Sequence, residues 1–133
     1  MIDELITLCT AQLKHPAGSF KTVEKAYSMK PLENLSVQTP ALLFMPGKDE
    51  GGEPSSWNPV RQMVIRRVHV FVLGDVDQIH DLCNELRPVM LSYRPYSDKT
   101  YTRLELEAGE PTDIKGVMWY VDTYVTRYQL TTS

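Results

Sequence analysis

Residues 61–74 read RQMVIRRVHVFVLG, and this stretch decides the fold class. Side chains of a β-strand alternate between two faces, so Gln62–Leu73 predicts a strand whose second half is apolar on both. The two faces carry, respectively, Val64, Arg66, Val68, Val70 and Val72, and Met63, Ile65, Arg67, His69, Phe71 and Leu73. One layer of helices covers one face of a sheet. We therefore expect the other face to meet a second layer or a neighbouring subunit.

Upstream of this strand the chain predicts one helix and two shorter strands. Residues 2–14 place apolar side chains at helical spacing, and Pro16 and Gly18 end that pattern. Phe20–Tyr27 alternates imperfectly and predicts a strand. Pro40–Met45 is apolar on both faces, which is typical of an inner strand.

Residues 46–60 read PGKDEGGEPSSWNPV and are dense in Gly, Pro, Ser and charge. This composition predicts a long exposed loop, of a length that usually signals function or disorder. Trp57 near its end is unusual for a flexible tip. Either it folds back on the body of the protein, or it is an exposed aromatic residue that contacts a partner.

Downstream, Gly74 predicts a turn and Asp75 a helix N-cap. The helix that follows has an apolar face, and Pro88 near its end predicts a kink or an early end. Two strands complete the chain: Thr102–Glu107, with its leucines inward, and Val117–Leu130, with a turn at 110–116 between them. The apolar helix face consists of Val76, Ile79, Leu82, Cys83, Leu86, Val89 and Met90.

These elements predict a single α+β domain over residues 1–133, with a mixed or antiparallel β-sheet packed against two α-helices in the order α-β-β-β-α-β-β. The net charge of −3 argues against a nucleic-acid-binding protein, which usually carries a basic excess. The first ten residues lack the basic region of a signal peptide, and no apolar run is long enough to span a membrane.

Catalytic and metal-binding motifs are not evident in the sequence. His80 and Cys83 could supply half of a zinc site, but no second half with suitable spacing accompanies them. The aspartates at 75, 77 and 81 resemble a calcium loop only superficially, and the helix dipole explains them. Cys9 and Cys83 are expected to be buried thiols, although one disulfide between helices is possible in principle. We expect no enzyme activity, no cofactor and no metal.

The candidate functional residues are instead those that would contact another protein subunit. Tyrosines 120, 124 and 128 share one face of the last predicted strand, and tyrosine is favoured at interfaces. The alternative is that this face lies under the N-terminal helix. The Arg66–Arg67 pair is expected to meet carboxylates rather than nucleic acid. The candidate interface residues are Trp57, Arg66, Arg67, Tyr120, Tyr124 and Tyr128.

Several segments, in this order and spacing, resemble the tail terminator family of long-tailed phages, which is related in architecture to the lambda tail terminator. They are FKTVEKAYSM (20–29), RQMVIRRVHVFVLGD (61–75), ELRPVMLSYRP (85–95), LELEAGE (104–110) and WYVDTYVTRYQL (119–130). A Gly-rich loop before the central strand fits the same layout.

The resemblance implies a virion protein of the phage tail, assembled in the host cytoplasm as a homohexameric ring. Such a ring caps the tail tube, ends tube polymerisation and provides the head-joining surface. Its implied partners are further copies of the chain, the tail tube protein and a head-completion or connector protein, with neither membrane nor direct nucleic-acid recognition. Two alternatives stay open: another ring-forming head–tail connector or tail-completion protein, and a small-ligand-binding or enzymatic α+β domain.

Overall fold

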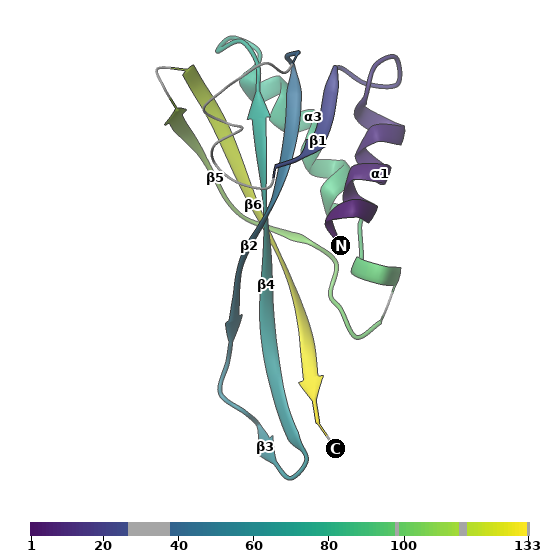
Figure 1. Cartoon of the computed structure of the whole chain (residues 1–133), viewed down its shortest axis with the longest axis vertical. Helices are drawn as coiled ribbons and strands as arrows, with labels where there is room; N and C mark the ends of the chain where they lie inside the picture. Colours follow the sequence, from purple (N-terminus) through teal and green to yellow (C-terminus); the bar gives the residue numbers. More distant parts are fainter. Residues whose placement is uncertain (27–37, 98, 115–116, 133) are drawn as a thin grey trace.

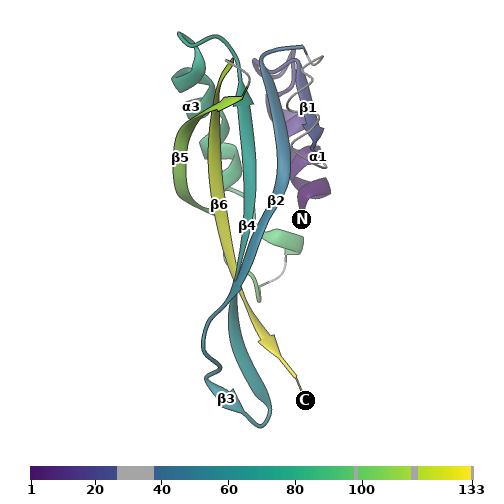
Figure 2. The ribbon, with the colours of Figure 1, turned by 60° about the vertical axis from the view of Figure 1, so that its left-hand side comes forward.

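The computed structural model describes residues 1–26, 38–97, 99–114 and 117–132, and it consists of one β-sheet with helices on one face (Figures 1 and 2). The helices are α1 (Ile2–Leu13), α3 (Ile79–Leu91) and the short 3-10 turn η1 (Pro95–Ser97). The strands are β1 (Thr22–Lys25), β2 (Ala41–Gly51), β3 (Ser56–Trp57), β4 (Val60–Leu73), β5 (Glu105–Ile114) and β6 (Val117–Thr131). The predicted α+β class is confirmed, and the predicted order holds apart from the additional short strand β3.

Strand β4 is the axis of the sheet, whose order is β1-β2-β4-β6-β5 with β3 paired to the start of β4. Only the β1–β2 pair is parallel among the strand pairs of the described residues; all others are antiparallel. On one side of β4, β2 pairs from Ala41↔Leu73 to Gly51↔Val64. On the other side, β6 pairs from Arg61↔Thr131 to Val72↔Tyr120. The long predicted strand is therefore central and hydrogen-bonded on both edges.

The main core lies between the helices and one face of the sheet. Its sheet side includes the alternate β4 residues Val68, Val70 and Val72, all fully buried. The helical side is supplied by residues at helical spacing, which confirms the apolar stripes predicted for both helices except at Val76. These helical residues are Leu5, Cys9, Leu13, Ile79, Leu82, Cys83, Leu86 and Met90.

A second apolar cluster lies on the opposite face of the same sheet. Phe71 and Leu73 of β4 belong to it, and the ring of Phe71 meets that of Trp119 edge-on with centroids 6.2 Å apart. The other members are Ala26, Ala41 and Leu43. Both faces of the second half of β4 are thus buried within one chain, as its two apolar faces predicted.

A buried ion pair joins α3 to the sheet. Asp122 is completely buried on β6 and accepts two hydrogen bonds from Arg87 of α3, at 3.0 and 2.9 Å. The hydroxyl of Tyr124 donates a third, at 2.9 Å. Gly109 of β5 is opposite Asp122, and a Cβ there would lie 2.7 Å from both the Arg87 and Asp122 side chains. The absence of a side chain at residue 109 therefore leaves the space that this ion pair occupies.

Three predicted details in the helix region are corrected. Asp75 is not the N-cap of α3: its carbonyl accepts a bond from the backbone N–H of Gln78, and this turn delays the helix to Ile79. Val76 consequently lies outside the helix and is 62% exposed. The helix continues past Pro88 to Leu91, so the early end was wrong.

The predictions for the last strands need two corrections. β5 begins only at Glu105 and extends to Ile114, so most of the predicted turn at 110–116 is strand; residues 115 and 116 lie outside the described residues. Leu104 is buried as predicted, but Leu106 is 37% exposed. The register of β5 against β6 shifts between Leu106 and Ala108, which interrupts the regular alternation there.

The cysteines are buried free thiols, as expected, and burial raises the pKa of Cys9 to about 12 and that of Cys83 to about 11. Neither thiol is therefore appreciably ionised at neutral pH. None of the helices in the described part of the chain is long and apolar enough to cross a membrane.

The packing of α3 predicts that Leu82→Ala lowers the free energy of unfolding by about 2–5 kcal/mol, because it leaves a cavity in the main core. Leu91→Ala on the same helix is the matched control, since Leu91 is 42% exposed, and should cost less than about 1 kcal/mol. Urea denaturation of both variants measures the difference. Equal losses would mean that α3 packs only loosely.

Candidate assembly surface

Beyond the helices the sheet continues as a projecting arm, which we define as residues 46–66 together with residues 127–132 (Figures 1 and 2). The prediction of a long exposed loop over 46–60 is wrong as to the loop, because β2 extends to Gly51, β3 forms at Ser56–Trp57 and β4 begins at Val60. Most of these residues are exposed, as predicted. At roughly 3.4 Å per residue, the seven residues from 60 to 66 advance about 20 Å.

The arm is built by pairing on both sides of β4. Asp49, Glu50 and Gly51 of β2 pair with residues 66, 65 and 64, and residues 128–131 of β6 pair with residues 64–61. At the tip, the backbone N–H of Gly52 donates to Met63 O at 2.9 Å and that of Ser55 to Arg61 O at 2.8 Å. The Gly, Pro and Ser residues that suggested a loop therefore form the turns of a hairpin.

A bulge marks the point where β2 leaves the body. The register of β2 against β4 shifts between Pro46 and Asp49. A Cβ at Gly47 would lie 2.8 Å from Cβ of Arg67 and 2.9 Å from Nε2 of His69, so glycine permits the close approach of the two strands here. Bulges bend and twist a strand, and this one lies at the base of the arm.

Apolar side chains are exposed on the arm. Trp57 is 76% exposed, Met63 46% and Leu130 43%. Trp57 is opposite Val60, and Leu130 is opposite Gln62. Because directly paired residues share a face and alternate residues of a strand do too, Trp57 and Leu130 lie on the face of the sheet that the helices cover further along. The open alternatives for Trp57 are thus resolved in favour of exposure in the single chain.

On the same face, Arg66 is held by a carboxylate and an aromatic ring. Its guanidinium donates to Asp49 of β2 with contacts of 3.1–3.4 Å and to the Tyr128 hydroxyl at 3.3 Å. It also lies 5.0 Å from the centre of the Tyr128 ring, which stacks in turn on Tyr101 at 4.9 Å. The hydrogen bond to Asp49 raises the pKa of Arg66. This cluster joins the three arm strands at their base.

On the opposite face, Arg67 makes the corresponding contact to β5. It donates to Glu107 at 2.9 and 3.1 Å and lies 3.7 Å from Glu50 of β2. The hydrogen bond from Arg67 lowers the pKa of Glu107. The expectation that both arginines meet carboxylates is confirmed. Since these groups are partly exposed, the pairs orient the strands more than they stabilise the fold.

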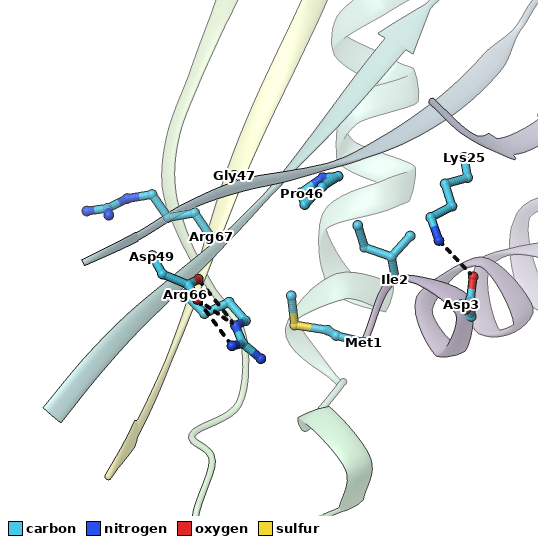
Figure 3. Close-up of a pocket in the computed structure, with 9 residues that line it drawn as sticks. All are labelled: Met1, Ile2, Asp3, Lys25, Pro46, Gly47, Asp49, Arg66 and Arg67. Carbon is cyan, nitrogen blue, oxygen red and sulfur yellow. Dashed lines mark hydrogen bonds and ion pairs between the residues drawn. The ribbon is translucent and has the colours of Figure 1, made fainter. Parts of the chain in front are cut away.

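A hollow of about 570 Å³ opens where the arm leaves the body, between the start of α1 and strands β2 and β4 (Figure 3). Lys25 of β1 pairs with Asp3 of α1 on one side of it, with 3.5 Å between Nζ and Oδ1. The Arg66–Asp49 pair bounds the other side, and the Arg67 side chain points away from α1. Its apolar wall consists of Met1, Ile2, Pro46 and Gly47.

The three candidate tyrosines have different positions. Tyr124 is completely buried in the main core, so its assignment to an interface is wrong. The alternative placed this face under the N-terminal helix, but the core around Tyr124 contains residues of both helices, and Arg87 of α3 binds Asp122, which accepts the bond from the Tyr124 hydroxyl. Tyr120 is partly buried against that core, and Arg87 lies 5.9 Å from its ring centre. Tyr128 alone reaches the arm. Among the six sequence candidates, the structure brings together Arg66 and Tyr128, while Trp57 lies at the tip.

Sequence reasoning missed several arm residues. Met63 and Leu130 were assigned to strands but not to a surface, and Asp49 and Glu107 were not recognised as the partners of the arginines. The signal for the hairpin was present: two strands flank a segment containing Gly51-Gly52 and Pro59, which is typical of turns. No group of three or more His, Cys, Asp or Glu in the described part of the chain is arranged to hold a metal ion.

Comparison with known proteins adds no family: no protein-family model matches the chain, and no curated protein matches it.

His69, at the base of the arm, makes the stability of the fold depend on pH. His69 is partly buried, its Nδ1 lies 2.9 Å from Thr123 Oγ1, and burial lowers its pKa below the ordinary value of 6.5. The unfolded chain therefore takes up a proton near pH 6.5 that the folded chain resists. Stability from this residue is present above that pH and is lost as the pH falls.

His69→Gln removes this linkage. The free energy of unfolding of the wild type relative to the variant should be constant above about pH 7 and should decline between about pH 6.5 and pH 5. Urea denaturation across that range measures it. A difference that stays constant, or that grows toward acid pH, would show that the ring is not buried as the structure places it.

Proposed function

We propose that this protein is a structural component of a phage tail, forming a ring that caps the tail tube, ends its polymerisation and provides the surface that joins the head. The proposal begins from the resemblance of residues 20–29 and 61–130 to tail terminators. The single structural observation that carries it is the arm, a paired β-ribbon that projects beyond the body and exposes Trp57 at its tip.

The arm has the features of a docking element. Its backbone is already paired, so little conformational entropy remains to be lost when it meets a partner. Tryptophan is a common anchor of protein interfaces because it buries a large apolar area. We assign the arm to the contact with the tail tube protein, because it is the part of the chain that extends farthest from the helix-covered body (Figure 1).

The charged base of the arm is consistent with this role. On one face of β4, Arg66 binds Asp49 of β2 and the Tyr128 hydroxyl of β6, and on the other face Arg67 reaches across β6 to Glu107 of β5. These contacts hold β2, β5 and β6 in register where the sheet loses its helical cover. Charged residues along Lys48–Glu50 also oppose uncontrolled pairing of the exposed β2 edge with other chains. An assembly protein that must stay separate until it reaches its partner needs such protection.

Trp57→Glu tests the assignment of the arm. Because the side chain is exposed, the free energy of unfolding should change by less than about 0.5 kcal/mol, and the circular dichroism spectrum should be unchanged. The variant should nevertheless fail to complement a phage that lacks the protein. Trp57→Phe, which keeps an apolar ring, should complement. Full complementation by Trp57→Glu would remove the arm from the function.

Electron microscopy of tails from a phage lacking the protein tests the function itself. A protein that ends tube growth leaves overlong tails when it is absent. Tails of normal length without heads would contradict the terminator proposal and support a connector or tail-completion protein instead. Tails of normal length with heads attached would contradict both.

A further inference from the structure

We propose that Tyr96, Tyr101 and Tyr128 act as a latch that fixes the direction of the arm relative to the helix-covered body, and that the strained backbone at Tyr96 relaxes when these contacts break. We call the three side chains the tyrosine ladder. This inference rests on the proposed function and deepens it, because an arm that docks on the tail tube must point in the same direction in every copy.

The tyrosine ladder is a continuous series of ring contacts. The rings of Tyr96 and Tyr101 meet edge-on with centroids 5.4 Å apart, and those of Tyr101 and Tyr128 lie 4.9 Å apart with 30° between their planes. Beyond Tyr128 the series continues into the arm through the guanidinium of Arg66, which binds Asp49 of β2. Aromatic pairs at such separations contribute stability beyond the area that they bury. Each ring therefore resists displacement of the next.

The two ends of the ladder belong to different parts of the molecule. Tyr96 lies in η1, and its hydroxyl accepts a hydrogen bond at 3.0 Å from the amino group of Met1, which precedes α1. Tyr128 lies on β6, where that strand enters the arm. Figures 1 and 2 show the 3-10 turn, in green, at the level at which the arm begins. The ladder thus connects the helical layer to the arm by side chains, in addition to the backbone of the sheet.

The middle of the ladder is anchored to β6 by the backbone. The N–H of Thr102 donates to Arg127 O at 2.9 Å, and the Thr102 hydroxyl accepts from the N–H of Arg127 at 3.0 Å. The Thr102 carbonyl accepts from the Thr126 hydroxyl at 2.7 Å. The preceding residue, Tyr101, forms a backbone bridge with Tyr128. The Tyr101 ring is therefore held in place between the arm and Tyr96.

The backbone at Tyr96 is strained. Its φ of 56° and ψ of 16° lie in the left-handed region, and among the described residues other than glycine it alone has a positive φ. This region crowds the Cβ of an L-residue, and such strain persists only where the surroundings hold it. The side chain is 49% exposed, so core packing does not hold it. Among its described contacts, those with Tyr101 and Met1 are the ones that can.

The arm has a place to bend at the same level. The register of β2 against β4 shifts between Pro46 and Asp49. A bulge interrupts the backbone hydrogen bonds between two strands, so the ribbon bends most easily there. Arg66 binds Asp49 directly after this bulge, which places the last contact of the series at the bend. The ladder is therefore positioned to fix the direction in which the arm leaves the body.

Distance measurements between two spin labels on the full chain test the latch. One label is placed at the tip of the arm by Glu53→Cys and the other on α1 by Gln12→Cys, both at exposed positions. The native thiols of Cys9 and Cys83 are buried and should not react. Tyr101→Ala interrupts the ladder, and Tyr101→Phe keeps the ring and is the matched control. Pulsed electron paramagnetic resonance then gives the distribution of distances in each protein.

The labelled protein with the native ladder and Tyr101→Phe should each give one narrow distribution. Tyr101→Ala should give a distribution about twofold broader, because the arm then moves about its base. Circular dichroism verifies that each protein is folded. If Tyr101→Ala does not fold, Tyr96→Ala at its half-exposed position replaces it in the same comparison. Equal widths in the folded variants, or a broad distribution with the native ladder, would overturn the latch.

A pair of substitutions at Tyr96 tests whether its backbone relaxes. Tyr96→Ala and Tyr96→Gly both remove the ring, but only glycine adopts a positive φ without strain. If the backbone relaxes once the ladder is broken, the alanine variant should melt at the same temperature as the glycine variant or higher. A higher melting temperature for the glycine variant would show that the fold itself imposes the strain, which overturns this part of the inference.

These measurements use the isolated protein, so their failure is distinguishable from failure of the proposed function. A latch that is disproved leaves the role in the phage tail standing, because tail length in the absence of the protein decides that role. Tails of normal length would in turn contradict the terminator role without changing the distance distributions.

Discussion

Hydrogen bonding of β4 along both edges is the constraint on which the rest of the structure depends. On one edge it pairs with β6 over residues 61–72, and on the other it pairs with β3 at residues 60–61 and with β2 over residues 64–73, so the pairing runs from the tip of the arm to the buried end of the sheet. Where both faces of β4 are apolar, helices cover one face and a second apolar cluster forms on the other. Where its side chains become charged at Arg66 and Arg67, the helical cover ends, but the backbone pairing continues. One strand therefore supports both a buried body and an exposed arm.

The ion pairs of the body and of the arm differ in how deeply they are buried. Inside the body, Asp122 is fully buried and is satisfied by Arg87 and Tyr124, so the charge ties α3 to β6. At the base of the arm, the arginine–carboxylate pairs are partly exposed and orient strands rather than stabilise a core. Beyond the base, apolar side chains are exposed at the tip. The surface proposed for the contact with the tube is thus the one where the single chain leaves apolar area exposed.

The sequence predicted the parts of the fold that follow from hydrophobic periodicity. The stripes on both helices and the two apolar faces of Gln62–Leu73 are local patterns, and the structure confirms them. The amino-acid composition of residues 46–60 is typical of a loop, and the sequence-based prediction was therefore wrong there. Pairing with neighbouring strands holds residues 46–51, and those from residue 60 onward, in a β-ribbon. Tyr124 was misassigned because periodicity shows which residues share a face but not where the helical cover stops. Exposure of Trp57, the carboxylate partners of Arg66 and Arg67, and the burial of Asp122 depend on contacts between distant segments, which no local pattern specifies.

Whether the arm is a rigid ribbon in the isolated protein is the central claim, and backbone hydrogen exchange of the free chain tests it most directly. Exchange of paired amides requires local opening, so strands in a cooperative sheet exchange slowly. The account predicts that the paired amides of residues 61–66 and 127–131 are protected in dilute, unassembled protein, together with those of residues 49–51 that face β4. It also predicts fast exchange of the amides of Glu53 and Asn58 at the tip, where the chain turns. Exchange of the whole segment at the rate of an unfolded peptide would show that the arm is a loop until it meets a partner, and would contradict this account.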